Sequence, residues 1–471
     1  MRRALVVGLG AALLSLSGCS RDEGVDAAEA HPGGMGGGAG ASSEKEEVPL
    51  ALVGAPLVFT PTDSSFGVSA VVGSGEPKEL ALWRRVRGTE SWMGPWAPAS
   101  PAPDVAEWRL RGLEAGTEYE YVLAAASRSE GDGPPPHDDL LYAGRAVTQR
   151  ASGEAFSFVL ISDTHIDPRE VSPGDWSASS YQEQVLLELA PQIAAEAPDF
   201  VVNLGDMLDF HVLGFNSPLP EPSWGRLGYV NYRRCLRDVI GHAAHFPVVG
   251  NWEGENGSFT AAEIANARGQ RKLYVPAPNA ETYPEGGSPD EDYYAFTWGD
   301  ALFVVLNVMS YTEESLLLDG VGSPDAWTLG EAQLRWLEDT LEAATSKWRF
   351  LLIHHAVGGA AGNDANAIYG RGGGLAANVG EQALVHDLMV RHGVQVFFYG
   401  HDHVFTDMVV DEIHYTLPGS AGAPWKFTSA ETGYEQYWPD SGYARVRVAP
   451  ESVDVEFLSI SGEVLHRYDL K

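Results

Sequence analysis

The chain has 471 residues, with 31 Lys and Arg against 65 Asp and Glu, a net charge of −34 at pH 7, and two cysteines. Nucleic-acid binders usually present a basic surface, so this balance argues against DNA or RNA as the main partner. Two cysteines cannot build a disulfide framework, and 44% hydrophobic side chains predict ordinary packed cores in roughly two or three domains.

The chain opens with two arginines and a short apolar run from Ala4 to Leu14. This run is too short to span a bilayer and is typical of a signal peptide. It ends at Leu16-Ser17-Gly18-Cys19, which resembles the lipobox of bacterial lipoproteins. The resemblance implies a signal peptide over 1–18, lipidation of Cys19, and export to the periplasmic or cell-surface face of a bacterial membrane. The alternative is an ordinary signal peptide with a cysteine there by chance.

Two regions without visible chemistry follow. Residues 19–48 are mostly Gly, Ala, Ser, Asp and Glu, which predicts a flexible linker. Between 49 and 150, short alternating runs separated by Pro, Gly and Ser predict a β-sandwich. Its segment 108–121 resembles the late strands of fibronectin type III domains, including the tyrosine that closes a corner. Because its single histidine is His137, a packing and spacing role is favoured over substrate or cell-wall binding.

From 155 to 471, apolar runs alternate with helical segments, which predicts an α/β domain whose sheets are covered by helices. Capping boxes predict helix starts at Thr260 and Thr328, and the helix after Thr328 carries a stripe of leucines at 334, 337 and 341. Six apolar runs are predicted as buried strands: 156–161, 200–204, 246–249, 302–306, 350–353 and 394–398.

Polar side chains follow most of these strands directly, in the segments 163–165, 206–209, 251–253, 354–355 and 401–403. The carboxyl ends of strands border the ligand crevice of open α/β sheets, so we expect these groups to converge. Side chains at i and i+2 of an extended chain point the same way, which pairs Asp163 with His165 and His401 with His403. Glycines precede three of the ligand candidates, where they allow sharp turns.

The donors form a mixed nitrogen and oxygen set that suits Zn, Mn, Fe or Ni. They are Asp163, His165, Asp206, Asn251, His354, His401 and His403. This set is too large for one tetrahedral ion and suits two ions that share a carboxylate.

The ordered series Asp-x-His, Gly-Asp-x-x-Asp, Gly-Asn-x-Glu, His and Gly-His-x-His, within residues 156–420, is similar to that of the calcineurin-like metallophosphoesterase superfamily. With the preceding fibronectin-like region, the chain resembles the purple acid phosphatases. The resemblance implies a four-layer αββα sandwich after an all-β sandwich, two metal ions (Fe, Zn or Mn), and hydrolysis of small phosphate monoesters by metal-activated hydroxide. The resemblance assigns Asp163, His165 and His403 as ligands of one ion. It assigns Asn251, His354 and His401 to the other, with Asp206 bridging both.

One departure from the family pattern affects proton transfer. Trp252 stands where the family commonly has a histidine that contacts the phosphate or protonates the leaving group, and an indole has no basic nitrogen. The candidates to replace that histidine are His211, His355 and Glu253. His354 is preferred to His355 as a ligand because it directly follows the strand. The expected substrate contacts are Asn251, Trp252 and Arg371.

A second departure concerns colour. Asp209 stands where purple acid phosphatases have a tyrosine ligand, which implies a colourless or weakly coloured protein. Cys235, among arginines, is interpreted as a bystander on a helix surface. Two alternatives to the monoesterase stay open: a phosphodiesterase or nucleotidase on the same site, and a metal- or phosphate-binding protein whose catalysis is impaired by Trp252.

Overall fold

The computed structural model describes residues 49–126, 140–167, 180–209, 222–313, 328–355, 381–429, 434 and 436–471. Cys19, the predicted signal peptide and the predicted linker lie outside this part of the chain, and so do His137, His211 and Arg371. None of the described helices is both long and apolar enough to cross a membrane.

The region before residue 150 consists of short strands, as its alternating pattern predicts. They are β1 (Ala51–Leu52), β2 (Leu57–Phe59), β3 (Ser65–Ser74), β4 (Leu80–Val86), β5 (Met93–Trp96), β6 (Ala99–Ala102), β7 (Val105–Arg111), β8 (Glu118–Ala125) and β9 (Leu140–Val147), with a 3-10 turn at Pro77–Glu79. One sheet has the order β5-β4-β8-β9 and is antiparallel. The Glu114 N–H donates to the Tyr119 hydroxyl at 2.9 Å, which is the tyrosine-corner contact of β-sandwiches. Assignment to the fibronectin type III class stays a prediction.

Two sheets form the centre of the remaining chain. One contains β10 (Phe156–Ile161), β11 (Phe200–Asn203), β12 (Ala244–Pro247), β19 (Gly442–Ala449), β20 (Ser452–Ser459) and β21 (Val464–Leu470). The other has the order β13-β14-β15-β16-β18-β17, with β13 (Tyr294–Trp298), β14 (Ala301–Val305), β15 (Trp348–Leu352), β16 (Val396–Phe398), β17 (Phe405–Val410) and β18 (Ile413–Pro418). All six predicted strands are confirmed, with slightly displaced ends.

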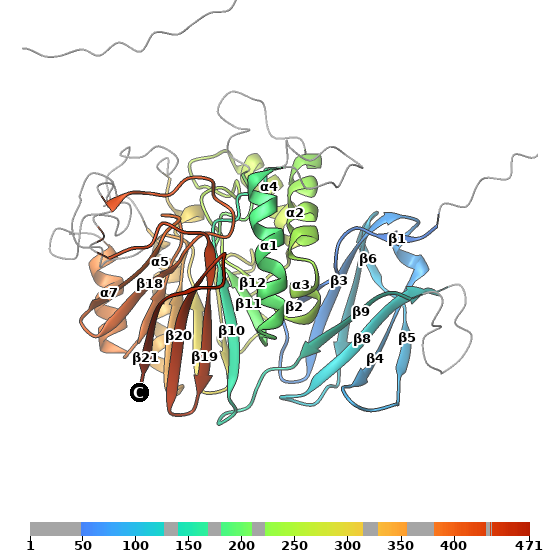
Figure 1. Ribbon diagram of the computed structural model, residues 1–471, viewed down its shortest axis with the longest axis horizontal. Helices are drawn as coiled ribbons and strands as arrows, with labels where there is room; N and C mark the ends of the chain where they lie inside the picture. Colours follow the sequence, from blue (N-terminus) through green and yellow to red (C-terminus); the bar gives the residue numbers. More distant parts are fainter. Residues whose placement is uncertain are drawn as a thin grey trace, which may run out of the picture. The chain divides into compact units, whose positions relative to one another are not determined.

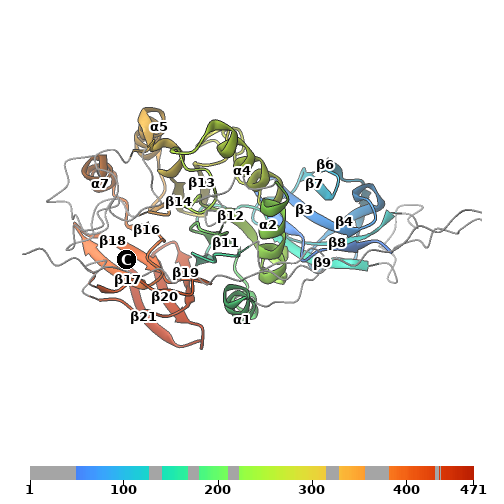
Figure 2. The same ribbon diagram turned by 90° about the horizontal axis from the view of Figure 1, so that it is seen from above.

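Helices cover the outer faces of both sheets (Figures 1 and 2). One set is α1 (Tyr181–Ala195), α2 (Pro222–Leu236), α3 (Asp238–His242) and α4 (Ala261–Tyr274); the other is α5 (Gly330–Ala343) and α7 (Glu381–Arg391), after a 3-10 turn at Met309–Tyr311. Separate buried clusters lie under each set, and a third lies between the sheets. There the rings of Phe158 and Phe303 meet edge to face at 5.1 Å. The predicted αββα sandwich is confirmed.

The N-terminal strands join the first of these sheets, which the sequence did not predict. Strand β2 pairs in parallel with β12, with Val58 opposite Ala244. The sheet therefore continues from β21 through β12 to β2, β3, β7 and β6, and with β1, which pairs with β3, it has 11 strands. The Tyr121 hydroxyl adds a hydrogen bond of 2.9 Å to the Gly241 carbonyl. The predicted domain division near residue 150 stays a prediction, and the regions on either side of it share a continuous sheet.

Two local expectations were wrong. Cys235, near the end of α2, is fully buried in a hydrophobic cluster rather than exposed on a helix surface. Burial raises its pKa to about 12, so the side chain is a neutral thiol. Thr328 does not cap α5 by a capping box. Its hydroxyl instead donates to the Glu381 carboxylate at 2.7 Å. The box at Thr260 is confirmed.

Candidate metal centre

The predicted ligands meet where the carboxyl ends of strands from the two sheets lie close to each other. Asp163, His165, Asp206 and His403 form one group of ligand atoms, all within 4.8 Å of one another, and His354, His355 and His401 form another. Asp206 lies between the groups, because its Oδ2 is 3.0 Å from His354 Nε2 and 3.7 Å from His165 Nε2. This position matches the bridging role that the resemblance implies for Asp206.

The backbone at these residues is not extended. Positive φ angles occur at Asp163 (54°), His165 (46°), Asp206 (52°), His401 (78°) and His403 (59°). Left-handed conformations of this kind are costly for non-glycine residues and gather at functional sites, where the surrounding structure enforces them. The expectation of an extended chain was therefore wrong, although Asp163 and His165 do share one group as predicted. Tight turns direct the side chains, and they send His401 and His403 to different groups.

Three glycines permit the loops to approach one another. Only Gly205 among them has a positive φ, of 101°. A Cβ on Gly250 would lie 2.3 Å from Asp206 Oδ1, and a Cβ on Gly400 would lie 2.3 Å from Ser162 Oγ. The glycine before Asp206 thus serves the predicted sharp turn, whereas the other two serve close packing of the ligand loops.

Acceptors outside the centre fix the ring orientation of two of the predicted ligand histidines. His354 Nδ1 donates to the Leu204 carbonyl at 2.8 Å, and His403 Nδ1 donates to the Trp425 carbonyl at 3.0 Å. Asp209 Oδ1 lies 3.4 Å from His165 Nδ1. The Nε2 atoms of His354 and His403 therefore face inward, as metal-bound histidines do when an outer partner holds the other ring nitrogen.

The inward-facing nitrogen and oxygen atoms lie close to one another. His165 Nε2 and His403 Nε2 are 3.1 Å apart. Asn251 Oδ1 lies 3.1 Å from His354 Nε2 and 3.0 Å from His401 Nδ1. With the amide reversed, its NH₂ group would donate to those two nitrogens and to Asp206 Oδ2. In the first orientation the electron pairs of Asn251, His354 and His401 converge on one point, as at a cation site, and in the reversed one the amide protons occupy that point. The residue types and their convergence therefore fit the metals that the family resemblance implies.

The charges at the centre lead to the same conclusion. Burial alone would raise the pKa of Asp163, but the neighbouring His403, His354 and His165 hold it below its ordinary value. Burial would lower the pKa of His354, but Asp206 and Asp163 raise it to about 9. Buried carboxylates thus create a negative field that a bound cation would neutralise.

Glu253 positions the loops and does not face the centre as a proton donor. Its buried carboxylate accepts the backbone N–H groups of Gly250 (2.5 Å), Met207 (2.6 Å) and Asp206 (3.1 Å). Burial and the charge of Asp206 raise its pKa to about 7. Because it clamps the loops that carry Asp206 and Asn251 together, the geometry does not favour its candidacy as the missing acid.

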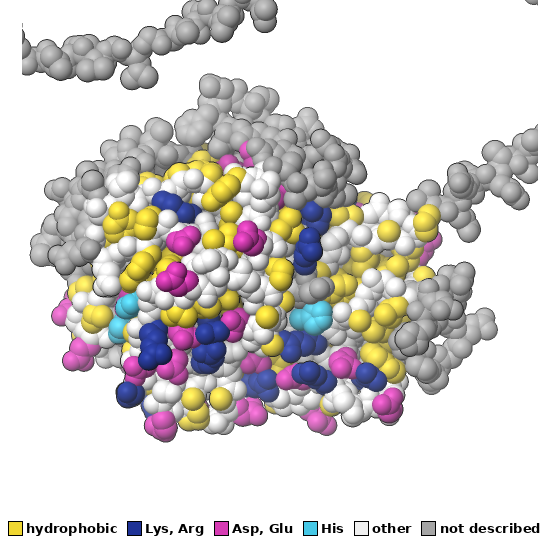
Figure 3. All heavy atoms as spheres, in the orientation of Figure 1, with side chains coloured by type: hydrophobic (Ala, Val, Ile, Leu, Met, Phe, Trp, Pro, Cys, Tyr) yellow, Lys and Arg dark blue, Asp and Glu magenta, His cyan; other side chains and the backbone are white. Residues whose placement is uncertain are grey.

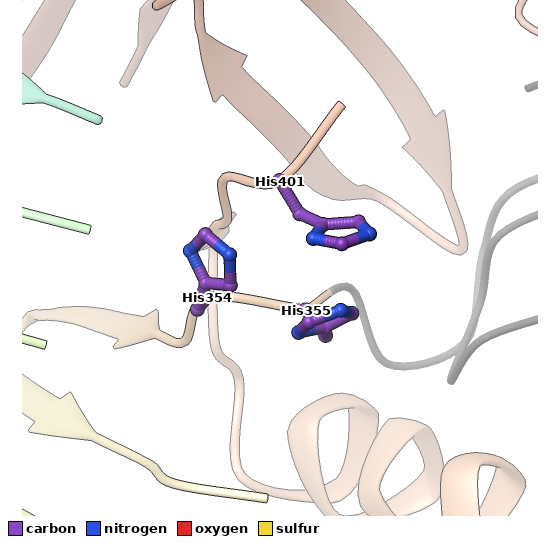
Figure 4. A group of neighbouring side chains, drawn as sticks. All are labelled: His354, His355 and His401. Carbon is purple, nitrogen blue, oxygen red and sulfur yellow. The ribbon is translucent and has the colours of Figure 1, made fainter. Parts of the chain in front are cut away.

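Two other predicted site residues do border the centre. The backbone N–H of Trp252 donates to Asp206 Oδ1 at 2.8 Å, and its indole ring lies 5.5 Å from the His165 ring. The His355 ring lies 3.8 Å from that of His401, and Figure 4 shows these two rings one over the other with His354 beside them. His355 is therefore the histidine outside the expected ligand set that the described structure places at the centre.

Sequence reasoning missed the segment Trp425–Phe427. The Trp425 ring lies 4.9 Å from His403 and 5.0 Å from His165, and the Phe427 ring lies 5.5 Å from His403. Burial lowers the pKa of Lys426 between them to about 8. The segment follows the carboxyl end of β18, so the strand-end rule applied to it as well. It was passed over because none of its side chains is a metal ligand.

Comparisons with known proteins agree with this geometry. A family model described as calcineurin-like phosphoesterase matches residues 156–405. The solved structure of PhoD is 16% identical, with a TM-score of 0.63 and 88% of each chain covered. Purple acid phosphatase PPD1 from yellow lupin (Lupinus luteus) seeds is 15% identical, with a TM-score of 0.61, 88% of this chain and 74% of that chain covered. At these identities the likeness concerns the fold alone. No curated protein matches the sequence significantly.

Proposed function

Because the chain belongs to the calcineurin-like phosphoesterase family, we propose that it hydrolyses phosphate monoesters at a dinuclear metal centre. The observation that supports this most strongly is the position of Asp206 between two groups of inward-facing donors. Bound cations would attract phosphate oxygens, lower the pKa of water and stabilise the entering and leaving oxygens of an in-line displacement.

The residues have separate roles in this proposal. Asp163, His165 and His403 would hold one ion, and Asn251, His354 and His401 would hold the other, with Asp206 shared between them. Asn251 and Trp252 also border the phosphate. We assign proton transfer to the leaving oxygen to His355, because it lies against His401 and because Trp252 has no basic nitrogen.

The negative charge of the chain does not oppose a phosphorylated substrate. The face shown in Figure 3 carries interspersed acidic and basic side chains rather than one acidic surface. The field at the ligand cluster would be set by the bound cations, which the net charge of −34 does not include. Small phosphorylated molecules therefore remain suitable substrates, whereas nucleic-acid polymers, which need an extended basic face, do not.

Hydrolysis of p-nitrophenyl phosphate and of bis-p-nitrophenyl phosphate tests the proposal. Protein stripped with a chelator and reloaded with Fe, Zn or Mn is expected to hydrolyse the monoester faster than the diester. Faster turnover of the diester would favour the phosphodiesterase or nucleotidase alternative. No turnover by any metal-loaded form, together with a gain of activity in Trp252→His, would favour a binding protein with impaired catalysis.

We also propose that the protein is exported and held to a bacterial membrane by a lipid on Cys19, with residues 49–150 as a packing and spacing region. The support is the lipobox-like sequence at 16–19. Fractionation of cells that express the wild type or Cys19→Ala tests the anchor. The wild type is expected with the membranes and the variant in the soluble fraction. A wild type that is found in the soluble fraction would contradict the proposal.

A further inference from the structure

The segment Trp425–Phe427 lies against the metal-ligand loops. Just before it, the Ala421 N–H donates to the Ser162 carbonyl at 2.8 Å, and the Ala423 N–H donates to the Asp163 carbonyl at 3.0 Å. A Cβ on Gly422 would lie 2.0 Å from the Thr164 carbonyl oxygen, so only glycine permits this approach. The chain that leads into Trp425 is thus fixed to the loop that carries Asp163.

The backbone and the side chain of Trp425 do different things. Its carbonyl accepts the Nδ1–H of His403 at 3.0 Å, so the backbone orients a ligand histidine. Its indole lies against the rings of His403 and His165, and 40% of the residue is still exposed. A large apolar surface that is held in place and partly open at the edge of a buried polar cluster is suited to contact what that cluster binds.

Two further aromatic side chains border the same cluster. The Trp252 ring lies 5.5 Å from His165, and the Phe427 ring lies 6.0 Å from His401. We call Trp252, Trp425 and Phe427 the aromatic rim. Lys426 adds a positive charge to it; its ammonium donates to the Ala423 carbonyl at 3.0 Å, and within the described residues it forms no ion pair.

We propose that Trp425 is a specificity-determining residue that stacks on a planar ring of the leaving group. Substrates would then be phosphoesters of ring-bearing alcohols, such as phenols or nucleosides, rather than of small aliphatic alcohols. The inference rests on the proposed function, because a phosphate held by the metals fixes how far the leaving group extends. Stacking of a ring on an exposed tryptophan strengthens binding by about tenfold.

Calorimetric binding of two non-hydrolysable ligands, phenylphosphonate and methylphosphonate, to the metal-loaded full chain tests this. The wild type is expected to bind phenylphosphonate about tenfold more tightly, since only that ligand has a ring to stack. Trp425→Ala is expected to lose this preference. Trp425→Phe, which keeps a planar ring and the same backbone carbonyl, is expected to retain most of it.

Trp92→Ala serves as the matched control. Trp92 is a half-buried indole in the N-terminal region, under the Arg85 guanidinium, and its loss is expected to leave the preference as in the wild type. Equal affinity of the wild type for both phosphonates, or an unchanged preference in Trp425→Ala, would overturn the inference and leave the proposed function standing. Failure of the metal-loaded wild type to bind either phosphonate would contradict both.

Discussion

His354 and Asp206 meet with 3.0 Å between Nε2 and Oδ2, although they follow strands of different sheets. Asp206 comes after β11 of the first sheet, and His354 comes after β15 of the second. The contact therefore closes the sandwich at its functional edge. Because both side chains are fully buried, the stability of this edge depends on how their charges are balanced.

Removal of the Glu253 carboxylate is expected to loosen the ligand loops. Glu253→Gln replaces a carboxyl group whose two oxygens accept several backbone N–H groups, so we expect a loss of about 2–3 kcal/mol in unfolding free energy. We also expect metal affinity to fall about 10- to 100-fold, as it does when outer partners of a metal site are removed. Urea denaturation and metal titration measure these effects. Glu451→Gln, at a carboxylate that is 90% exposed, is the control, and equal behaviour of the two variants would contradict the role given to Glu253.

Iron-loaded protein is expected to show no strong visible absorption band. The strong colour of purple acid phosphatases comes from a tyrosinate ligand, and Asp209 stands at that position, 3.4 Å from His165 Nδ1. The predicted ligand set consists of Asp, His and Asn residues and contains no tyrosine. An absorption spectrum of the iron-loaded wild type is sufficient, and an intense visible band would show that a tyrosine from elsewhere enters the centre.

Two glycine substitutions are expected to change stability in opposite directions. Gly422→Ala places a Cβ 2.0 Å from the Thr164 carbonyl oxygen, so we expect a destabilisation of about 1–3 kcal/mol. Gly269→Ala, within α4 and with nothing within 4 Å of the added Cβ, should stabilise by about 0.5–1 kcal/mol. Thermal melts compare them. A wild-type melting temperature for Gly422→Ala would mean that the segment before Trp425 is not held as described.

Asp407 is expected to make stability depend on acid pH. Burial would raise its pKa, but hydrogen bonds from His414, His466 and Thr416 lower it below the ordinary value. A lowered native pKa means that the unfolded chain binds the proton more readily, so the stabilisation is present above about pH 4 and is lost as the pH falls through the native pKa.

Asp407→Asn should therefore lower the unfolding free energy by about 1–2 kcal/mol at pH 7 and by progressively less below about pH 4. Denaturation curves across this range, with Asp454→Asn at an exposed position on β20 as the control, check the expectation. A penalty for Asp407→Asn that does not change with pH would contradict it.

The convergence of the predicted ligand residues could be anticipated from the sequence because a local rule located them. Buried strands are legible as apolar runs, and polar side chains at their carboxyl ends converge in any sheet of this kind. The left-handed turn at Asp163 could not be predicted from the sequence, because positive φ is expected of glycine and contacts between loops impose it here. The pairing of Val58 with Ala244 could not be predicted either, because the local hydrophobic pattern does not indicate which distant strand will be the partner. Trp425 was missed because an exposed aromatic residue has no metal-ligand signature.

Metal analysis of wild type and Asp206→Ala, purified in parallel and paired with rates on p-nitrophenyl phosphate, tests the central claim most directly. Asp469→Ala, at an exposed carboxylate on β21, is the control. We predict about two ions per chain and measurable hydrolysis for the wild type and the control, and loss of both the ions and the activity in Asp206→Ala. An Asp206→Ala variant that keeps the wild-type metal content and rate would contradict the assignment of a shared, Asp206-bridged metal centre.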